Sequence, residues 1–399
     1  MNYKKFFPIF QNLPDLVYLD SAASAQKPKV VVDRISEFYE YEYANIHRGV
    51  YGLSENATRC FENTRDVVAK FLNVEDRDQI VFTKNATEAI NLVAYSFGEE
   101  LPPNSTILIT EMEHHANFVP WVELARRKNF KLKVVPLNNM GYITADDVMD
   151  CIDDSVFMVA VTQLSNVLGV RVDVKRIIEK AKDHGARVLI DGSQSVCHMK
   201  IDLAELDPDF FVFSGHKLYG PSGVGVLYIK KEVATGMKPF LTGGDMVLKV
   251  SENGILFQDV PHKFEAGTPD IASVIGLGTA IRFLSEIGMV NIEQNDIEKI
   301  NYALNLLKQL DFVELVIDVL PGICLSSVAF NVKGVHPHDV AQVLGDMNIC
   351  VRAGHHCAQP LHSALKLEAS VRMSLGIYND FSDIDKLVEG LKIVSQKFC

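Results

Sequence analysis

The chain has 399 residues, of which 48% are hydrophobic and 23% are charged, and its formal net charge at pH 7 is −12. This composition is ordinary for a globular enzyme with a large core, and the negative charge argues against general binding to nucleic acid or to anionic membranes. At roughly 150 residues per domain, the length favours two or three domains, or one large α/β domain with a smaller companion.

The seven cysteines are scattered along the chain and form no C-x-x-C pair. An odd number of cysteines in a chain of this length does not predict a disulfide framework, which favours a reducing compartment. The N-terminal segment has no apolar run long enough for a signal peptide, and no run approaches the roughly 18 apolar residues of a membrane span. We therefore expect a cytoplasmic protein without a membrane segment.

Apolar runs alternate with amphipathic segments in the first half of the chain. The runs that predict strands are 79–83, 106–110, 156–165, 187–194 and 209–217, and the segments that predict helices are 85–97, 119–129 and 172–185. Near-continuous apolar runs are typical of strands buried on both faces. Their alternation with helices predicts a parallel sheet covered on both sides. In the helix at 172–185, Asp173 can cap the start and Gly185 can close the end.

The pattern changes after about residue 270, where helices become longer and strands shorter. Predicted helices occupy 271–288, 295–310 and 380–398, and a predicted strand occupies 326–332. We interpret this region as a smaller α/β domain packed on the first.

Polar or ionisable residues follow the predicted strands at the point where each strand ends. In an open parallel sheet, ligands bind beyond the carboxyl ends of the strands. The residues at these ends are Asn85–Thr87, Glu111–Asn117, Ser165 and Asn166, Asp191–Gln194 and Ser214–Lys217. A single residue of this kind is more often a cap or a loop residue, but five sets at one edge predict a ligand site.

Four of these residues together predict a pyridoxal phosphate site. Lys217 follows an apolar strand, where partial desolvation lowers the pKa of a lysine and suits its amine to Schiff-base chemistry. Asp191 can pair with a pyridinium nitrogen, and Thr87 at the start of a helix can bind a phosphate. His114 can lie flat on an aromatic ring. Taken singly, Lys217 is more often a solvated surface lysine, and Asp191 is more often a turn cap.

Two other functions are compatible with these residues. A transaminase would use the same cofactor site. A non-catalytic or metal-binding protein would use the histidines and cysteines, of which the pairs 114–115 and 336–338 have the spacing of partial metal sites. No further ligand is evident beside either pair, so we expect no metal site.

The stretch RAGHHCAQP, residues 352–360, places two histidines and a cysteine between a glycine and a proline. A metal site, a buried thiol and a nucleophile on a loop all fit these residues, and cysteine is among the most buried residue types. The predicted pyridoxal phosphate site favours the nucleophile, because a thiol on a flexible loop can enter such a site and swing out again.

Several stretches make the chain similar to a known family. They are YLDSAASAQKP (18–28), NIHRGVYGLS (45–54), NATEAINLVA (85–94), MEHHANFVPW (112–121), SNVLG (165–169), DGSQSV (191–196), FSGHKLYGPSGVGVLY (213–228), FEAGTP (264–269), RAGHHCAQP (352–360) and SVRMSLGIYN (370–379). In order and content they resemble the class V aminotransferase family of fold-type I pyridoxal phosphate enzymes, specifically the SufS/CsdA-type cysteine desulfurases. SGHKLYGP together with RAGHHCA is the most specific of these signals.

The resemblance implies a fold with a large domain, built on a mainly parallel seven-stranded sheet flanked by helices, and a smaller C-terminal α/β domain. We expect the large domain to span 14–284. The small domain, which carries the cysteine loop, is expected to span 285–399 together with 1–13. The segment 236–263 matches the family loosely, so its role is left open.

The resemblance also implies roles for individual residues. Lys217 binds the cofactor covalently and moves the Cα proton, His114 stacks on the cofactor ring, and Cys357 is the nucleophile. The residues expected to hold pyridoxal 5′-phosphate are Lys217, Asp191, Gln194, His114, Ala86, Thr87, Ser214, His216 and Thr268. The residues expected to bind or surround the substrate are Arg372, Asn166, Arg352, His47 and Arg48. Ala86 stands where the family often has threonine, so only its backbone N–H is expected to reach the phosphate.

The implied reaction converts L-cysteine to L-alanine and leaves a persulfide on Cys357, with selenocysteine lyase activity as a side possibility. The persulfide sulfur would supply iron–sulfur cluster assembly through a SufE- or SufU-like acceptor protein. Thr268 is expected to reach the phosphate of a neighbouring subunit, which predicts a homodimer.

Overall fold

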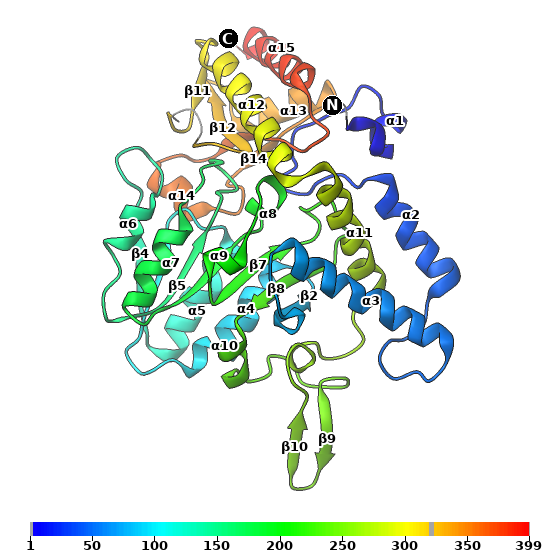
Figure 1. Ribbon diagram of the computed structural model, residues 1–399. Helices are drawn as coiled ribbons and strands as arrows, with labels where there is room; N and C mark the ends of the chain where they lie inside the picture. The colour runs from blue at the N-terminus through cyan, green and yellow to red at the C-terminus, as the bar shows by residue number, and fades with distance from the viewer. Residues whose placement is uncertain (1–2, 319–322, 399) are drawn as a thin grey trace.

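A seven-stranded sheet forms the centre of the computed structural model, which describes residues 3–318 and 323–398 (Figure 1). Its order is β2-β8-β7-β6-β5-β3-β4, and β8 runs antiparallel to β2 and β7 while the other neighbours run parallel. The strands are β2 (Ile80–Thr83), β3 (Thr106–Thr110), β4 (Lys131–Val135), β5 (Val156–Thr162), β6 (Arg187–Asp191), β7 (Phe210–Ser214) and β8 (Gly225–Ile229). The prediction of a mainly parallel seven-stranded sheet is confirmed.

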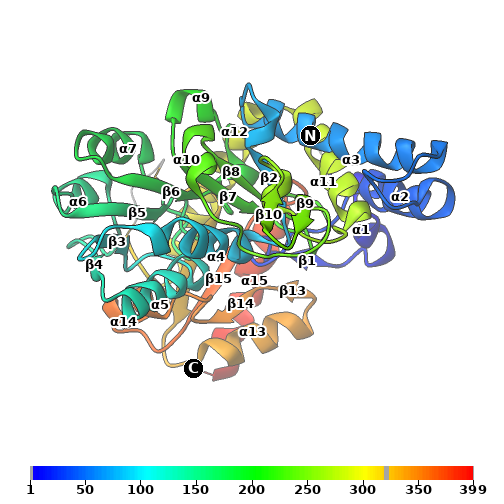
Figure 2. The ribbon, with the colours of Figure 1, turned by 90° about the horizontal axis from the view of Figure 1, so that it is seen from below.

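Helices cover both faces of this sheet. They are α2 (Lys29–Glu37), α3 (Gly52–Phe71), α4 (Ala86–Ser96), α5 (Val119–Lys128), α6 (Ala145–Met149), α7 (Val174–Asp183), α8 (Ser195–His198), α9 (Leu203–Leu206), α10 (Lys231–Gly236) and α11 (Ile271–Ile287). Figure 2 shows α4 and α5 on one side of the sheet and α7 on the other. Gly185 takes a positive φ of 72° after α7 as predicted, but the side chain of Asp173 makes no capping hydrogen bond.

The sheet separates two hydrophobic cores, one on each face, and the side chains of β7 contribute to both. Phe211 and Phe213 belong to the same core as α7 and α11, and Phe210 and Val212 belong to the same core as α4 and α5. Successive side chains of a strand point to opposite faces, so a strand buried on both faces is apolar at every position. This is the physical reason that continuous apolar runs predicted these strands.

The C-terminal part contains a second, antiparallel sheet in the order β11-β12-β15-β14. Its elements are α12 (Met289–Lys308), β11 (Val313–Leu315), β12 (Ser327–Val332), α13 (Pro337–Asp346), β13 (Ile349–Cys350), β14 (Arg352–Gly354), α14 (Gln359–Ala364), β15 (Ser370–Ser374) and α15 (Phe381–Phe398). The helices predicted at 295–310 and 380–398 and the strand predicted at 326–332 are present, and Figure 1 shows this unit beside the larger sheet.

The expected domain boundary after residue 284 lies inside α11, and the axis bends by 75° between α11 and α12. Residues near the N-terminus join the C-terminal unit: η1 (Lys4–Phe6) and α1 (Pro8–Asn12) precede β1 (Val17–Tyr18), which pairs with β13. Residues 1–2, 319–322 and 399 of the expected small domain lie outside the described residues. The division into 14–284 and 285–399 with 1–13 stays a prediction.

Among the described residues, no single helix is long and apolar enough to cross a membrane, and α11 with α12 passes that test only as a bent pair.

Candidate active site

A cavity of about 260 Å³ lies at the carboxyl ends of the parallel strands. The predicted residues that line it are Ala86, Thr87, His114, Asn166, Asp191, Ser214, His216, Lys217, Arg352 and Arg372. They come from the ends of β6 and β7, the start of α4, the loops after β3 and β5, and the β14 and β15 strands of the C-terminal unit. The expectation that strand ends deliver these side chains to one place agrees with this geometry.

Lys217 and Asp191 follow two neighbouring parallel strands, so both side chains reach the same edge. Burial lowers the pKa of the Lys217 amine, while the Asp191 carboxylate acts in the opposite direction. Asp191 is 5% exposed, and its Oδ1 accepts a hydrogen bond from the Ser193 N–H at 2.9 Å. No described residue forms an ion pair with this carboxylate. A buried, unpaired carboxylate facing a cavity suits a cationic ring nitrogen.

The first turn of α4 forms the opposite end of the cavity. Asn85 caps the helix by accepting a hydrogen bond from the Glu88 N–H, and the Ala86 N–H donates to Ser214 Oγ at 2.9 Å. The N–H of Ala86, which we expected to reach a phosphate, is therefore engaged with Ser214. The Ser214 hydroxyl can still donate its own hydrogen to a phosphate, because it only accepts from Ala86. The exposed Thr87 adds a second hydroxyl at the start of α4, where the helix dipole is positive.

The rings of His114 and His216 are held neutral. His114 Nδ1 accepts a hydrogen bond from the Ala116 N–H at 3.0 Å, which places the ring hydrogen of the neutral form on Nε2. Burial, with the nearby Lys217 amine, lowers the pKa of His114 to about 3. Burial likewise lowers the pKa of His216 to about 4, and its Nδ1 lies 3.2 Å from Ser24 Oγ. A neutral imidazole on the cavity wall suits stacking on an aromatic ring.

The cavity residues fit pyridoxal phosphate. A buried primary amine can bind its aldehyde, an unpaired carboxylate can bind its ring nitrogen, a helix N-terminus with hydroxyls can bind its phosphate, and a neutral ring can cover its face.

Arg372 lies deep in the wall of the cavity on β15 and is 1% exposed. Its Nη2 donates to Asp20 Oδ1 at 2.7 Å and its Nη1 donates to the Asn166 carbonyl at 2.9 Å, while Nε has no partner. Arg352 also lines the cavity and forms no ion pair with a described residue. Two guanidinium groups and one carboxylate leave a net positive region that suits the carboxylate of an amino acid.

Cys357 lies beside the cavity rather than in its lining. It lines a neighbouring hollow of about 390 Å³, and Thr87, His114 and Ala116 line both spaces. Arg352 Nη2 lies 3.9 Å from Cys357 Sγ. The Cys357 thiol therefore lies next to residues that line the cavity, and the guanidinium group near it, that of Arg352, also lines the cavity.

The other predicted residues lie elsewhere in this chain. Gln194 Nε2 donates to the Ala22 carbonyl at 2.9 Å, behind the cavity wall. Thr268 lines a separate hollow together with Gly267 and Pro269. These side chains do not line the cavity within the chain, and their proposed contacts with the cofactor stay predictions.

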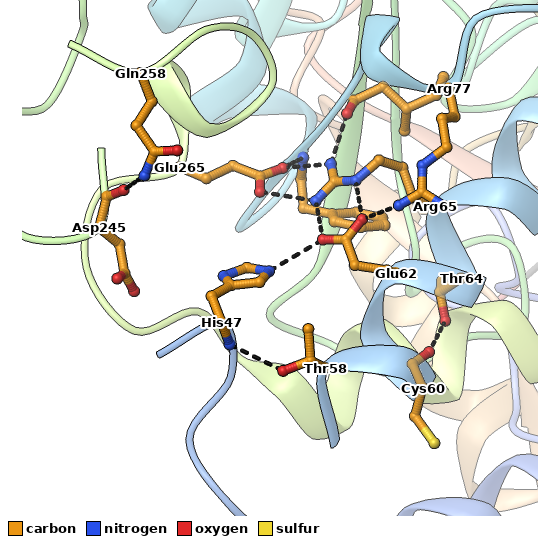
Figure 3. A network of polar contacts seen from close by, with 12 residues as sticks. His47, Thr58, Cys60, Glu62, Thr64, Arg65, Arg77, Asp245, Gln258 and Glu265 are labelled. Atoms are coloured by element: carbon orange, nitrogen blue, oxygen red, sulfur yellow. Dashed lines mark hydrogen bonds and ion pairs between the residues drawn. The ribbon is translucent and has the colours of Figure 1, made fainter. Parts of the chain in front are cut away.

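His47 and Arg48 do not line the cavity, and Figure 3 shows the polar network to which His47 belongs. His47 Nε2 lies 3.1 Å from Glu62 Oε1, and Glu62 binds the fully buried Arg65, which also pairs with Glu265 at 2.8 Å. Arg48 pairs with Asp245 at 2.8 Å. Within this chain neither residue lines the cavity, and their expected position at the mouth of the site stays a prediction.

Glu113 is a buried carboxyl group next to His114 in the chain, and sequence reasoning did not single it out. It is 1% exposed and accepts hydrogen bonds from Thr110, Asn117 and the Thr162 N–H. Burial raises the pKa of this carboxyl group to about 8. The stretch MEHHAN contains the residue, but only the three-dimensional structure shows the burial that raises its pKa.

The Glu113→Gln substitution is expected to flatten the pH dependence of stability. Between about pH 4.5 and pH 8 the folded protein keeps a proton that the unfolded chain has lost, so the free energy of unfolding falls as pH rises through this range. Glutamine keeps the uncharged form and removes this slope. Denaturant unfolding at about pH 5 and about pH 8 measures it, with the exposed Glu123→Gln as control. An unchanged slope in Glu113→Gln would show that Glu113 does not bind this proton.

The comparisons with known proteins agree with this geometry. Residues 17–387 match the family model "Aminotransferase class-V". A probable cysteine desulfurase of Halalkalibacterium halodurans is 44% identical over 99% of this chain and 98% of its own length. The crystal structure of the cysteine desulfurase CsdA (S-sulfonic acid) from Escherichia coli has a TM-score of 0.92 and 37% identity, covering 100% of this chain and 98% of that chain. An apo cysteine desulfurase from Thermococcus onnurineus has a TM-score of 0.95 and 35% identity, covering 100% and 99%. The chain therefore belongs to the class V aminotransferase family, among the cysteine desulfurases.

Proposed function

We propose that the protein is a pyridoxal-phosphate-dependent cysteine desulfurase in which Lys217 and Cys357 carry the reaction. One observation supports these residues above all: His114 lines both the cavity that holds Lys217 and Asp191 and the hollow that holds Cys357, and Arg352 of the cavity lies 3.9 Å from Cys357 Sγ. When bound, pyridoxal phosphate supplies an electron sink for the Cα of an amino acid.

The cavity residues orient the substrate and move its protons. Arg372 and Arg352 bind the carboxylate of L-cysteine, which fixes the Cα near the Lys217 amine. Burial lowers the pKa of that amine, so a larger fraction is unprotonated and can take the Cα proton as a general base. Asp191 would pair with the ring nitrogen of the bound cofactor, and His114 would cover one face of its ring.

The sulfur step is proposed to occur at Cys357. Its thiolate attacks the sulfur of the substrate, an S–S bond forms, and the Cβ–S bond of the substrate breaks. The electron pair of the broken bond stays with the substrate carbon, which takes up a proton and leaves as the methyl group of L-alanine. Cys357 keeps the transferred sulfur as a persulfide, so the step needs no outside oxidant or reductant.

Intact-mass analysis without reductant tests this function. After incubation with L-cysteine, the protein is expected to gain the mass of one sulfur atom on the peptide that contains Cys357, and L-alanine is expected to accumulate. Alanine without a persulfide on that peptide would contradict the nucleophile. Neither product, from protein that binds the cofactor, would favour the transaminase. Colourless protein that carries metal would favour the non-catalytic alternative.

The persulfide sulfur is proposed to pass to a SufE- or SufU-like acceptor and on to iron–sulfur cluster assembly. The hollow beside Cys357 supports a route to an acceptor that does not cross the cavity. Selenocysteine is a second candidate substrate, because selenium can replace sulfur in the same step. We propose the cytoplasm as the location, since the six cysteines within the described residues are all free.

A homodimer is proposed from the exposed surfaces of the chain. The segment 236–263, whose role the sequence left open, contains the hairpin β9 (Val247–Ser251) and β10 (Gly254–Phe257), which projects from the body (Figure 1). Its Leu248 is 62% exposed and its Leu256 is 58% exposed. A projecting apolar hairpin suits burial against a second subunit, and Thr268 and Arg48 are proposed to complete the site of the partner subunit. Sedimentation measures the mass of this assembly.

A further inference from the structure

The loop that carries Cys357 has an unusual backbone. His356 and Cys357 have φ angles of 52° and 57°. Two consecutive residues with side chains in the left-handed region are uncommon, and such a conformation persists only where the surroundings hold it. The contacts of this loop should therefore show which groups hold it.

Backbone contacts hold the loop on the side of the large sheet. The carbonyl of His356 accepts a hydrogen bond from Asn166 Nδ2 at 2.8 Å. The carbonyl of Cys357 accepts one from the His115 N–H at 2.7 Å. His115 Nε2 accepts one from the Gln359 N–H at 3.0 Å. These bonds connect the loop to the residues that follow β5 and β3.

The His356 ring holds the loop on the opposite side, where β15 lies. It is 3% exposed, and its Nε2 lies 3.1 Å from the Ser370 carbonyl and 3.0 Å from Ser370 Oγ. A carbonyl only accepts hydrogen bonds, so the ring hydrogen is on Nε2. Burial lowers the pKa of His356 well below its ordinary value, which keeps the ring neutral. Its Nδ1 has no partner, so Nε2 alone anchors the ring.

A second histidine completes a closed set of contacts. His362 Nδ1 lies 3.0 Å from the Ala358 carbonyl, so this nitrogen donates, and His362 Nε2 accepts from Ser370 Oγ at 3.0 Å. The hydrogen bonds run from His356 to Ser370, from Ser370 to His362, and from His362 back to Ala358. They therefore fix the residues on both sides of Cys357 to one serine of β15. We name His356, Ser370 and His362 the loop clamp.

We propose that His356 is a positioning residue that, through the loop clamp, holds Cys357 in the left-handed conformation between the cavity and the neighbouring hollow. His356 also lines the cavity, but its ring offers the substrate no free polar atom, since its Nδ1 is buried and its Nε2 is occupied. The meaning of this position for catalysis rests on the proposed role of Cys357 as nucleophile. The holding of the loop is a separate property that can be measured without any turnover.

His356→Asn tests the clamp. Asparagine tolerates a positive φ, but it is too short to reach Ser370, so the variant removes the anchor and spares the backbone. Loss of one buried hydrogen bond is expected to speed hydrogen–deuterium exchange of the 352–360 peptide about fivefold to tenfold. Persulfide formation in a single turnover is expected to slow by about the same factor with the KM for L-cysteine unchanged, because substrate binding does not use the ring.

Two further variants make the result specific. His355→Asn changes the exposed neighbouring histidine, whose ring meets His362 edge to face but makes no hydrogen bond with a described residue. Because the hydrogen bonds of the clamp do not use this ring, the variant is expected to match the wild type in both measurements. Ser370→Ala keeps the carbonyl that accepts from His356 and removes only Oγ, so a smaller change in the same direction is expected. It tests the clamp if His356→Asn does not fold.

Unchanged exchange in His356→Asn and Ser370→Ala would overturn the clamp. Faster exchange with wild-type persulfide formation would overturn the positioning role. A raised KM would assign His356 to substrate binding instead. If the wild type forms no persulfide on Cys357, the proposed function fails, and the exchange measurements still decide whether the clamp holds the loop.

Discussion

The Lys217→Ala substitution is expected to abolish conversion of L-cysteine, with a loss of roughly 10³-fold or more. The reason is that alanine removes the buried amine that we propose binds the aldehyde of the cofactor and takes the Cα proton as a base. The cavity otherwise keeps its shape, because Lys217 Nζ forms no hydrogen bond with a described residue. Alanine production by purified protein, together with the absorbance of bound cofactor, measures both losses.

The control for this change is Lys128→Ala, which removes an exposed lysine at the end of α5. It is expected to keep the absorbance and the activity of the wild type. A Lys217→Ala protein that still turns over L-cysteine at a comparable rate would refute the assignment of the base, whereas loss of folded protein in circular dichroism would move the test to Lys217→Arg.

The Cys357→Ser substitution is expected to separate cofactor binding from sulfur transfer. A hydroxyl is a far weaker nucleophile toward sulfur than a thiolate, so persulfide formation and alanine production should fall by roughly 10³-fold or more. The cofactor absorbance should not change, because Cys357 lies outside the lining of the cavity. Stopped-flow absorbance after mixing with L-cysteine should still show substrate binding.

Cys151→Ser provides the matched control, since Cys151 is a partly buried free cysteine that lies outside both the cavity and the hollow. It is expected to form the persulfide at the wild-type rate. Undiminished alanine production by Cys357→Ser would mean that another group accepts the sulfur or that the sulfur leaves without an acceptor on the protein.

Sequence reasoning was most successful where local pattern and topology act together. Lys217 and Asp191 could be predicted because each follows an apolar strand, and parallel strands bring their carboxyl ends to one edge. The strand β4 was missed because Lys131 and Lys133 interrupt its apolar run, as an edge strand tolerates. The family resemblance added Arg372 and strengthened the assignment of Cys357, because both residues lie far from Lys217 in the chain and no local pattern connects them with it.

The properties that could not be predicted depend on contacts between distant segments. The protonation of Glu113 follows from burial against residues of β5 and η5 (His115–Asn117). Asp20 could not be assigned to Arg372, because the two lie at opposite ends of the chain. The loop clamp likewise joins three residues whose types are common in loops, and only their hydrogen bonds distinguish them.

The separation of the cavity from the hollow has a consequence for the order of events in a catalytic cycle. Because Cys357 lines its own hollow, a persulfide sulfur on this residue can meet an acceptor while the cavity is empty, binding substrate or releasing product. Binding of L-cysteine and transfer of sulfur to the acceptor then do not use the same opening. An acceptor protein can then bind at the hollow before L-alanine leaves the cavity, and Thr87, His114 and Ala116 form the wall that the two spaces share.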